Sequence, residues 1–140
     1  MSVSENKALY RRYLEILNAR RPDMLDEVVS PDFVGHDLPH GFLAGREGLK
    51  QYRSMLDHAF PDFEAVLQDI VAEDDRVAAR VRMHGHHRGE FAGVAATGRL
   101  VNTELFEIVR IHHGKIAERW LLRDRLAEML QLGITPATVH

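Results

Sequence analysis

The chain contains no cysteine among its 140 residues. Disulfide bonds, thiolate nucleophiles and metal sites built on cysteine are therefore excluded. Lysine is scarce as well, and Lys7, Lys50 and Lys115 fall on expected helix surfaces or in a turn, which disfavours Schiff-base chemistry. The sequence also lacks a Gly-rich phosphate loop, a GxSxG elbow and an HExxH motif, so the common nucleotide, serine hydrolase and zinc protease sites are not indicated.

Neither positive nor negative charge dominates the sequence, and it contains no long apolar run. A net charge of -3 gives no basic surface for nucleic acid or an anionic membrane. No stretch approaches the ~18 apolar residues of a membrane helix, and the start, MSVSENKALYRR, has no apolar segment typical of a signal peptide. We therefore expect a cytoplasmic protein with neither nucleic acid nor a membrane as partner.

The first part of the chain has the periodicity of helices. Its length fits one domain, residues 1–140. Apolar residues at helical spacing predict helices from about Ser4 to Ala19 and from about Arg46 to Phe60. A second short helix is expected to start at Pro22 and to end at Pro31, and the segment FVGHDLPHGFLAG then reads as a short extended piece and a loop.

From Phe63 onward the apolar residues alternate with period two, which is typical of strands. The pattern predicts strands at Phe63–Ala72, Val77–His86 and Arg99–Ile111, and a final strand that hands over to a terminal helix at Asp124. Helices followed by a four-stranded antiparallel run indicate an α+β fold. A twisted sheet that curls around the helices leaves a cavity between them, where small-molecule sites are common.

Asp124 is the leading catalytic candidate. By parity it shares a strand face with Trp120 and Leu122, so its carboxylate is expected to point at an apolar interior. Loss of hydration would raise its pKa and make it a proton carrier near neutral pH. The alternative is that Asp124 is only the N-cap of the terminal helix, a frequent role for Asp that needs no chemistry; the residue pattern alone favours the cap.

His36, Tyr13 and Trp120 are candidate donors to an enolate oxygen in the same cavity. Each also has an ordinary role. Tyr13 lies on the apolar face of the first helix and could serve only packing, Trp120 could be a pocket wall, and His36 precedes a loop and could be solvated.

The strand Arg99–Ile111 is apolar on both faces, so it is expected to lie either between helices and a second layer or between a pocket and a subunit interface. Glu104 and Phe106 share one of these faces, and we assign both to the substrate pocket. Glu104 could then act as a second acid. It could also be exposed at a sheet edge, or pair with an Arg on the neighbouring strand, and Arg80 and Arg82 make that pairing the favoured alternative.

The histidines near the second strand were considered as metal ligands. His84, His86 and Glu90 approximate an HxH-plus-Glu arrangement. The Glu comes one residue too early and no second motif follows, so we interpret this segment as a solvated polar strand end and predict no metal, and the role of the cluster His84, His86 and His87 stays open.

Several segments carry a family resemblance. The pieces ENKALYRRYLEILNAR, SPDFVGHDLP, GREGLKQYRSMLDHAFPDF, HRGEFAGVAATGR and GKIAERWLLRDRLAEMLQLG, in this order, resemble the SnoaL-like polyketide cyclases over nearly the whole chain. The resemblance implies a cone-shaped α+β barrel of the nuclear transport factor 2-like type, with an apolar pocket and with homodimers that pack through the sheet. It also implies aldol ring closure of a polyketide ester, a small apolar substrate, by one acidic residue without metal or organic cofactor. Asp124 matches that acid, and His36 matches a pocket-lining histidine.

The chain departs from the family in its tail. Family members often read HWD-V-W-D where this chain has Arg119-Trp120-Leu121-Leu122-Arg123-Asp124. By parity the two arginines lie on the face opposite Asp124.

Two other functions stay open. A hydrolase or isomerase, opening an epoxide or moving a double bond, would need a second carboxylate, for which the direction of Glu104 is diagnostic. A non-catalytic ligand-binding or dimerisation module would leave Asp124 exposed.

Overall fold

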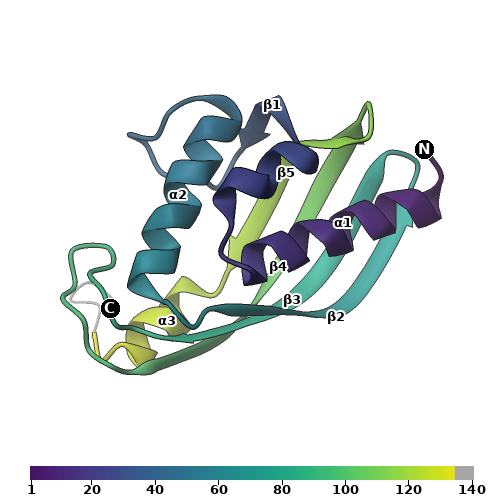
Figure 1. Ribbon diagram of the computed structural model, residues 1–140. Helices are drawn as coiled ribbons and strands as arrows, with labels where there is room; N and C mark the ends of the chain where they lie inside the picture. Colours follow the sequence, from purple (N-terminus) through teal and green to yellow (C-terminus); the bar gives the residue numbers. More distant parts are fainter. Residues whose placement is uncertain (135–140) are drawn as a thin grey trace.

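The computed structural model describes residues 1–134, which form three α-helices, a 3₁₀ helix and a five-stranded sheet (Figure 1). The elements are α1 Val3–Asn18, η1 Pro22–Glu27, β1 Val29–Gly35, α2 Gly45–Ala59, β2 Glu64–Glu73, β3 Arg76–His86, β4 Leu100–His112, β5 Lys115–Arg123 and α3 Arg125–Gln131. The strand order is β1-β5-β4-β3-β2. The predicted α+β class is confirmed.

The helix predicted at the start of the chain is present as α1. It begins with a capping box, in which the Ser2 hydroxyl accepts from the Glu5 amide and the Glu5 carboxylate accepts from the Ser2 amide. One face of α1 then buries Tyr10, Tyr13 and Leu17 against the sheet. Since fully burying such side chains contributes about 1.5–3 kcal/mol each, this face fixes the helix to the sheet.

The region after α1 differs from the expectation. The short helix ends at Glu27, and Pro31 lies inside a strand instead of ending a helix. Strand β1 pairs in parallel with β5 and is an edge strand, where the missing N–H of proline is tolerated. The sheet is therefore mixed and has five strands. The parallel pairing joins segments far apart in the sequence, so no local sequence pattern indicates it.

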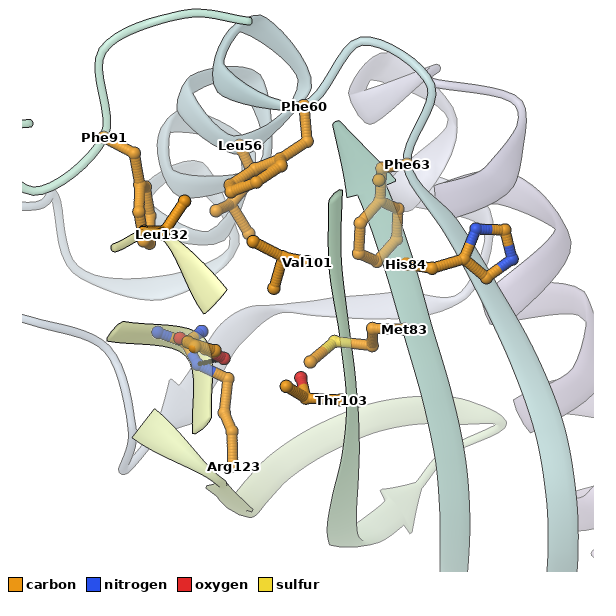
Figure 2. A pocket seen from close by; sticks show the side chains of 12 residues that line it. Leu56, Phe60, Phe63, Met83, His84, Phe91, Val101, Thr103, Arg123 and Leu132 are labelled. Carbon is orange, nitrogen blue, oxygen red and sulfur yellow. Dashed lines mark ion pairs between the residues drawn. The ribbon is translucent and has the colours of Figure 1, made fainter. Parts of the chain in front are cut away.

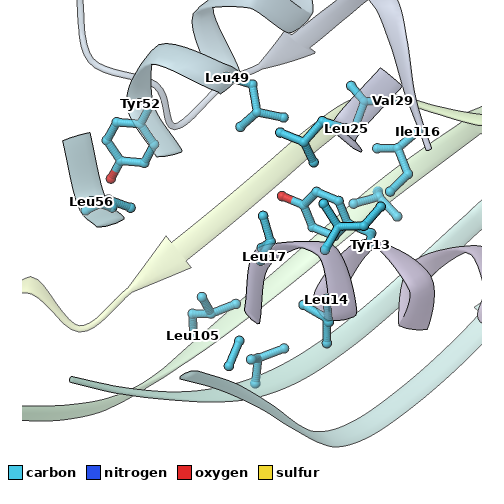
Figure 3. Close-up of a cluster of buried hydrophobic side chains, with 14 of the residues drawn as sticks. Tyr13, Leu14, Leu17, Leu25, Val29, Leu49, Tyr52, Leu56, Leu105 and Ile116 are labelled. Atoms are coloured by element: carbon cyan, nitrogen blue, oxygen red, sulfur yellow. The ribbon is translucent and has the colours of Figure 1, made fainter. Parts of the chain in front are cut away.

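Strands β2 to β5 form the predicted antiparallel series. Helices α1 and α2 lie on the same face of this sheet (Figure 1), and α3 packs at one end of β4. The apolar core fills the space between the two long helices and the sheet, as Figure 3 shows around Tyr13, Leu49 and Leu105. Alternate residues of the strands therefore point either into this core or outward.

The outer face of the sheet carries exposed apolar side chains. Phe106 is 59% exposed, Leu122 is 81% exposed, and Val71 and Ile108 are exposed beside them. In a sheet that is apolar on both faces, each strand carries two sets of apolar side chains, one that points to the interior and one that points outward. This property decides which predicted site residues lie in the interior.

Candidate functional site

Asp124 does not enter the interior. It is exposed, and its carboxylate accepts a hydrogen bond from the Ala127 amide at 2.9 Å as the N-cap of α3. Arg119, Leu121 and Arg123 are side chains of β5 that line the interior, whereas Leu122 points outward. The prediction that Asp124 points into an apolar interior is therefore wrong, since the apolar residues sharing its parity belong to the outer face.

A polar cavity lies between the helices and the sheet. The space in it that a water molecule can occupy has a volume of about 40 Å³. Charged and hydroxyl groups enter it from α1, the segment after β1, α2, β4 and β5; they belong to Tyr13, Asp37, Tyr52, Arg53, Glu107, Arg119 and Arg123. We call this space the inner cavity.

Glu107 is the one carboxylate among the buried polar side chains of residues 1–134, with 5% of its surface exposed. The Tyr10 hydroxyl donates a hydrogen bond to its Oε1. Burial raises the pKa of Glu107, and this effect exceeds the opposing influence of Arg119 and of the Tyr10 hydrogen bond. Glu107 is thus a carboxyl group that holds its proton at a higher pH than an exposed glutamate.

Arg119 lies beside Glu107 and is 4% exposed. Its Nε and Nη2 donate to the two carboxylate oxygens of Asp37 at 3.0 and 2.7 Å, and its Nη1 donates to the Tyr13 hydroxyl at 3.0 Å. Burial acts to lower the pKa of Arg119, but the oxygens of Tyr13, Asp37 and Glu107 hold that pKa above its ordinary value. This two-pronged ion pair keeps the guanidinium charged and orients the Tyr13 hydroxyl.

An apolar pocket adjoins the inner cavity. The space in it that a water molecule can occupy has a volume of about 50 Å³, and its walls are Leu56, Phe60, Phe63, Phe91, Val101 and Leu132. Figure 2 shows Met83, Thr103 and Arg123 on the side facing these walls. Leu56, Phe63, Met83 and Arg123 line both spaces, so a ligand in the apolar pocket would reach the polar groups of the inner cavity.

Arg123 is fixed at this junction. Its Nη1 donates to the Tyr52 hydroxyl at 2.7 Å, and its Nε lies 2.9 Å from a carboxylate oxygen of Glu128 in α3. Burial raises the pKa of Glu128, with Arg123 acting in the opposite direction. The terminal helix thereby places an ionisable carboxyl group at the edge of the apolar pocket.

Of the predicted donors, Tyr13 lines the inner cavity and the other two do not. His36 is half exposed, with its Nε2 2.7 Å from the Glu118 carboxylate. Its ring stacks on Trp120, with 5.1 Å between ring centroids and 13° between planes. Neither ring lines the inner cavity or the apolar pocket, so their placement as interior donors is wrong.

Glu104 and Phe106 lie on the outer face of the sheet. The Arg80 guanidinium donates to Glu104 at 2.6 Å, which is the pairing favoured from the sequence. Phe106 borders a hollow on that outer face. Their assignment to the substrate pocket is wrong, because β4 directs its even-numbered side chains away from the helices.

The histidines at the end of β3 contact different partners. His84 lies 3.7 Å from Glu64, and His86 Nδ1 lies 2.6 Å from Asp62. His87 is buried and its Nδ1 accepts from the Thr97 amide at 3.2 Å. Within residues 1–134 no group of three His, Cys, Asp or Glu side chains is arranged to hold a metal ion, and no helix there is long and apolar enough to span a membrane.

Sequence reasoning missed most of the polar groups of the inner cavity. Glu107 carries a usable signal, because it shares its strand face with Leu105 and Val109, two apolar residues of the expected strand Arg99–Ile111. Arg119 and Arg123 carried a weaker one, as residues on the face opposite Asp124. Asp37 and Arg53 had none, since a loop residue and a helix residue reveal their direction only in the folded chain.

Comparison with known proteins supports the resemblance. Residues 7–132 match the family model of SnoaL-like polyketide cyclases. The chain is 33% identical over 132 residues to the aklanonic acid methyl ester cyclase DauD of Streptomyces sp. (strain C5), covering 89% of this chain and 80% of that protein.

Solved structures agree with this relationship. TsrD of Streptomyces laurentii superposes with a TM-score of 0.89 at 26% identity, covering 96% of this chain and 99% of TsrD. IdmH of Streptomyces antibioticus superposes with a TM-score of 0.80 at 32% identity, covering 92% of this chain and 99% of IdmH. The chain therefore belongs to the SnoaL-like polyketide cyclase family.

Proposed function

We propose that the protein is a cyclase that closes a ring in a polyketide ester by aldol addition, with Glu107 as the proton carrier. The observation that carries this proposal is the buried carboxyl group of Glu107, which lines the inner cavity and whose pKa burial raises. A base of this kind suits proton transfer near neutral pH. The relative DauD is named a cyclase of aklanonic acid methyl ester, which supports the substrate class.

The reaction would proceed by two proton transfers at one residue. The Glu107 carboxylate removes a proton from a methylene group between two carbonyls, and the resulting carbanion attacks a ketone carbon of the same molecule to form the new C–C bond. The protonated Glu107 then returns the proton to the alkoxide. The Tyr13 hydroxyl, which Arg119 positions, can donate to an enolate oxygen during these steps.

The position of Glu107 in the sheet supports its role. Glu107 pairs directly with Leu121 across β4 and β5. Leu121 stands where the family tail HWD-V-W-D has its first aspartate, and its side chain lines the inner cavity. The Glu107 carboxyl group therefore reaches the same part of the cavity as Leu121, but from the neighbouring strand β4.

The proposal is tested by separating Glu107 from Asp124. With aklanonic acid methyl ester as substrate, Glu107→Gln should lower kcat/KM by at least about 100-fold, the usual contribution of a general base. Asp124→Asn, which preserves the cap, should stay within about twofold of the wild type, as should Glu73→Gln, a control at an exposed acid. Loss of turnover in Asp124→Asn with retention in Glu107→Gln would reverse the assignment.

A hydrolase is the second candidate, because Asp37 binds the Arg119 guanidinium and Glu107 also interacts with its charge. Two carboxylates joined in this way could activate a water molecule and protonate an epoxide oxygen. Mass spectrometry distinguishes the reactions: ring closure leaves the substrate mass unchanged, whereas hydrolysis adds one water and incorporates ¹⁸O from labelled solvent.

We also propose that a second copy of the chain covers the outer face of the sheet. This face exposes Phe106, Ile108 and Leu122 around a hollow and carries the Arg80–Glu104 ion pair, a pattern typical of an interface between copies. Light scattering should therefore give a dimer for the wild type and a monomer for Leu122→Glu. A monomeric wild-type protein at micromolar concentration would rule this interface out.

A further inference from the structure

Arg53 of α2 is a buried cation without a matching acceptor. It is 6% exposed, and its Nε and Nη2 have no hydrogen-bond partner. The nearest carboxylate oxygen belongs to Asp57, at 3.7 Å from Nη2, which is too long for a hydrogen bond. Its guanidinium lies 4.6 Å from the centre of the Phe63 ring. A buried charge normally has an ion partner and hydrogen-bond acceptors, so this arrangement is incomplete.

The other guanidinium groups of the inner cavity have such partners. Arg119 binds both carboxylate oxygens of Asp37, and Arg123 donates from Nη1 to the Tyr52 hydroxyl and forms an ion pair with Glu128, although its Nε makes no hydrogen bond. Glu107, the remaining buried carboxyl group, accepts from Tyr10. Arg53 and Glu107 line the same cavity. Arg53 is therefore a guanidinium of this cavity whose Nε and Nη2 make no hydrogen bond, and its Nη2 lies on the side of Asp57.

We propose that Arg53 holds the enolate oxygen of the ligand in the inner cavity, and is a catalytic residue that binds the negative charge created when Glu107 removes the proton. The preferred ligands are then carbonyl compounds with an ionised enol. This inference rests on the proposed function, which places the ligand in the inner cavity beside Glu107. The guanidinium offers two N–H groups in one plane, and charge-assisted hydrogen bonds from it are stronger than those from the neutral Tyr13 hydroxyl.

A matched pair of small quinones tests this without turnover. 2-Hydroxy-1,4-naphthoquinone is an ionised enol at neutral pH, and its O-methyl ether is neutral and nearly the same size. The chain has no cysteine that these quinones could modify. The hydroxyquinone should bind at least about tenfold more tightly than the ether, when the absorption of each quinone is followed during titration with the protein.

Variants assign this preference to Arg53. Arg53→Gln should bring the two affinities within about twofold of each other, Arg53→Lys should keep part of the difference, and Arg11→Gln, at an exposed arginine of α1, should keep all of it. In ¹³C-methyl methionine spectra the Met83 signal should shift on binding, since Met83 lines the inner cavity, whereas the exposed Met1 should not.

Several results would overturn the proposal. These are equal binding of the two quinones, no binding of the hydroxyquinone, an unchanged preference in Arg53→Gln, or an unshifted Met83 signal. If Arg53→Gln does not fold, the Arg53→Lys variant and the wild-type preference still decide, because the wild type must lose affinity as acid neutralises the quinone. Failure of the proposed function would be separate, since it would appear as turnover retained in Glu107→Gln while quinone binding still depended on Arg53.

Discussion

The Arg119–Asp37 pair offers a direct test of how the inner cavity is held together. Asp37→Asn removes the negative charge while it keeps the size of the side chain. Arg119 has 4% of its side chain exposed and Asp37 has 9%, so the variant leaves a buried guanidinium without its hydrogen-bonded carboxylate. Breaking a buried ion pair by removing one partner costs about 3–5 kcal/mol.

This loss is large enough to measure by two methods. For a chain of this size it corresponds to a fall in Tm of roughly 10–20 °C. Urea unfolding should show the same loss as a lower midpoint at an unchanged slope. Asp23→Asn is the matched control, because Asp23 pairs with Arg21 at the surface, where both side chains are more than half exposed, and its expected cost is about 0–1 kcal/mol.

A second substitution separates charge burial from general damage. Replacing Arg119 by Met in the Asp37→Asn background removes the unpaired cation, so the double variant should recover most of the lost stability. If the free energy of unfolding of Asp37→Asn lies within about 1 kcal/mol of the wild-type value, water reaches Arg119 and the description of this cavity as a desolvated site is wrong.

The remaining predictions concern single positions. Because the pKa of Glu107 is raised from 4.5, its stabilising contribution is present below about pH 4.5 and is lost as pH rises through the raised value; Glu107→Gln should therefore gain relative stability with pH, at up to about 1.4 kcal/mol per unit, and parallel urea-derived profiles would contradict this. In Gly48→Ala the new Cβ would lie 1.8 Å from the Leu43 carbonyl oxygen, so thermal unfolding should show a loss of about 1–3 kcal/mol, larger than for Gly85→Ala, where the nearest atom is 3.3 Å away; an equal loss would refute the steric reason. Asp124→Ala should lose about 1 kcal/mol as a missing N-cap and Asp124→Asn much less, and equal losses would show that the cap is not the cause.

Elements with one buried face could be predicted from the sequence. Helices α1 and α2 and strand β3 each carry a clear alternation of apolar and polar residues, and each lies within two residues of its predicted range. Strand β1 was predicted only in part, as the short extended piece that begins at Phe33, since its pairing with β5 joins Val29 to Ile116. The existence of that strand depends on a partner almost ninety residues away, and a local pattern cannot show it.

The candidate site was harder, because its side chains come from separate elements. Tyr13, Asp37 and Glu107 gather around Arg119 from α1, the segment after β1, and β4. Each of these residues has an ordinary role when considered alone. Only their convergence makes a buried polar network, and convergence is a property of the fold.

The error over Asp124 has a physical cause in the sheet itself. On a strand with one apolar face, Trp120 and Leu122 would mark the interior, and a carboxylate in register with them would be buried. Strand β5 instead has an apolar outer face, so the same parity leads to the surface. The acid of the interior then comes from β4, where Glu107 pairs with Leu121. Cross-strand neighbours on one face lie close enough to bring their functional groups to the same region. If Glu107 is the proton carrier, as we propose, a family match made position by position preserves the fold and yet places the carboxyl group one strand away from its true position.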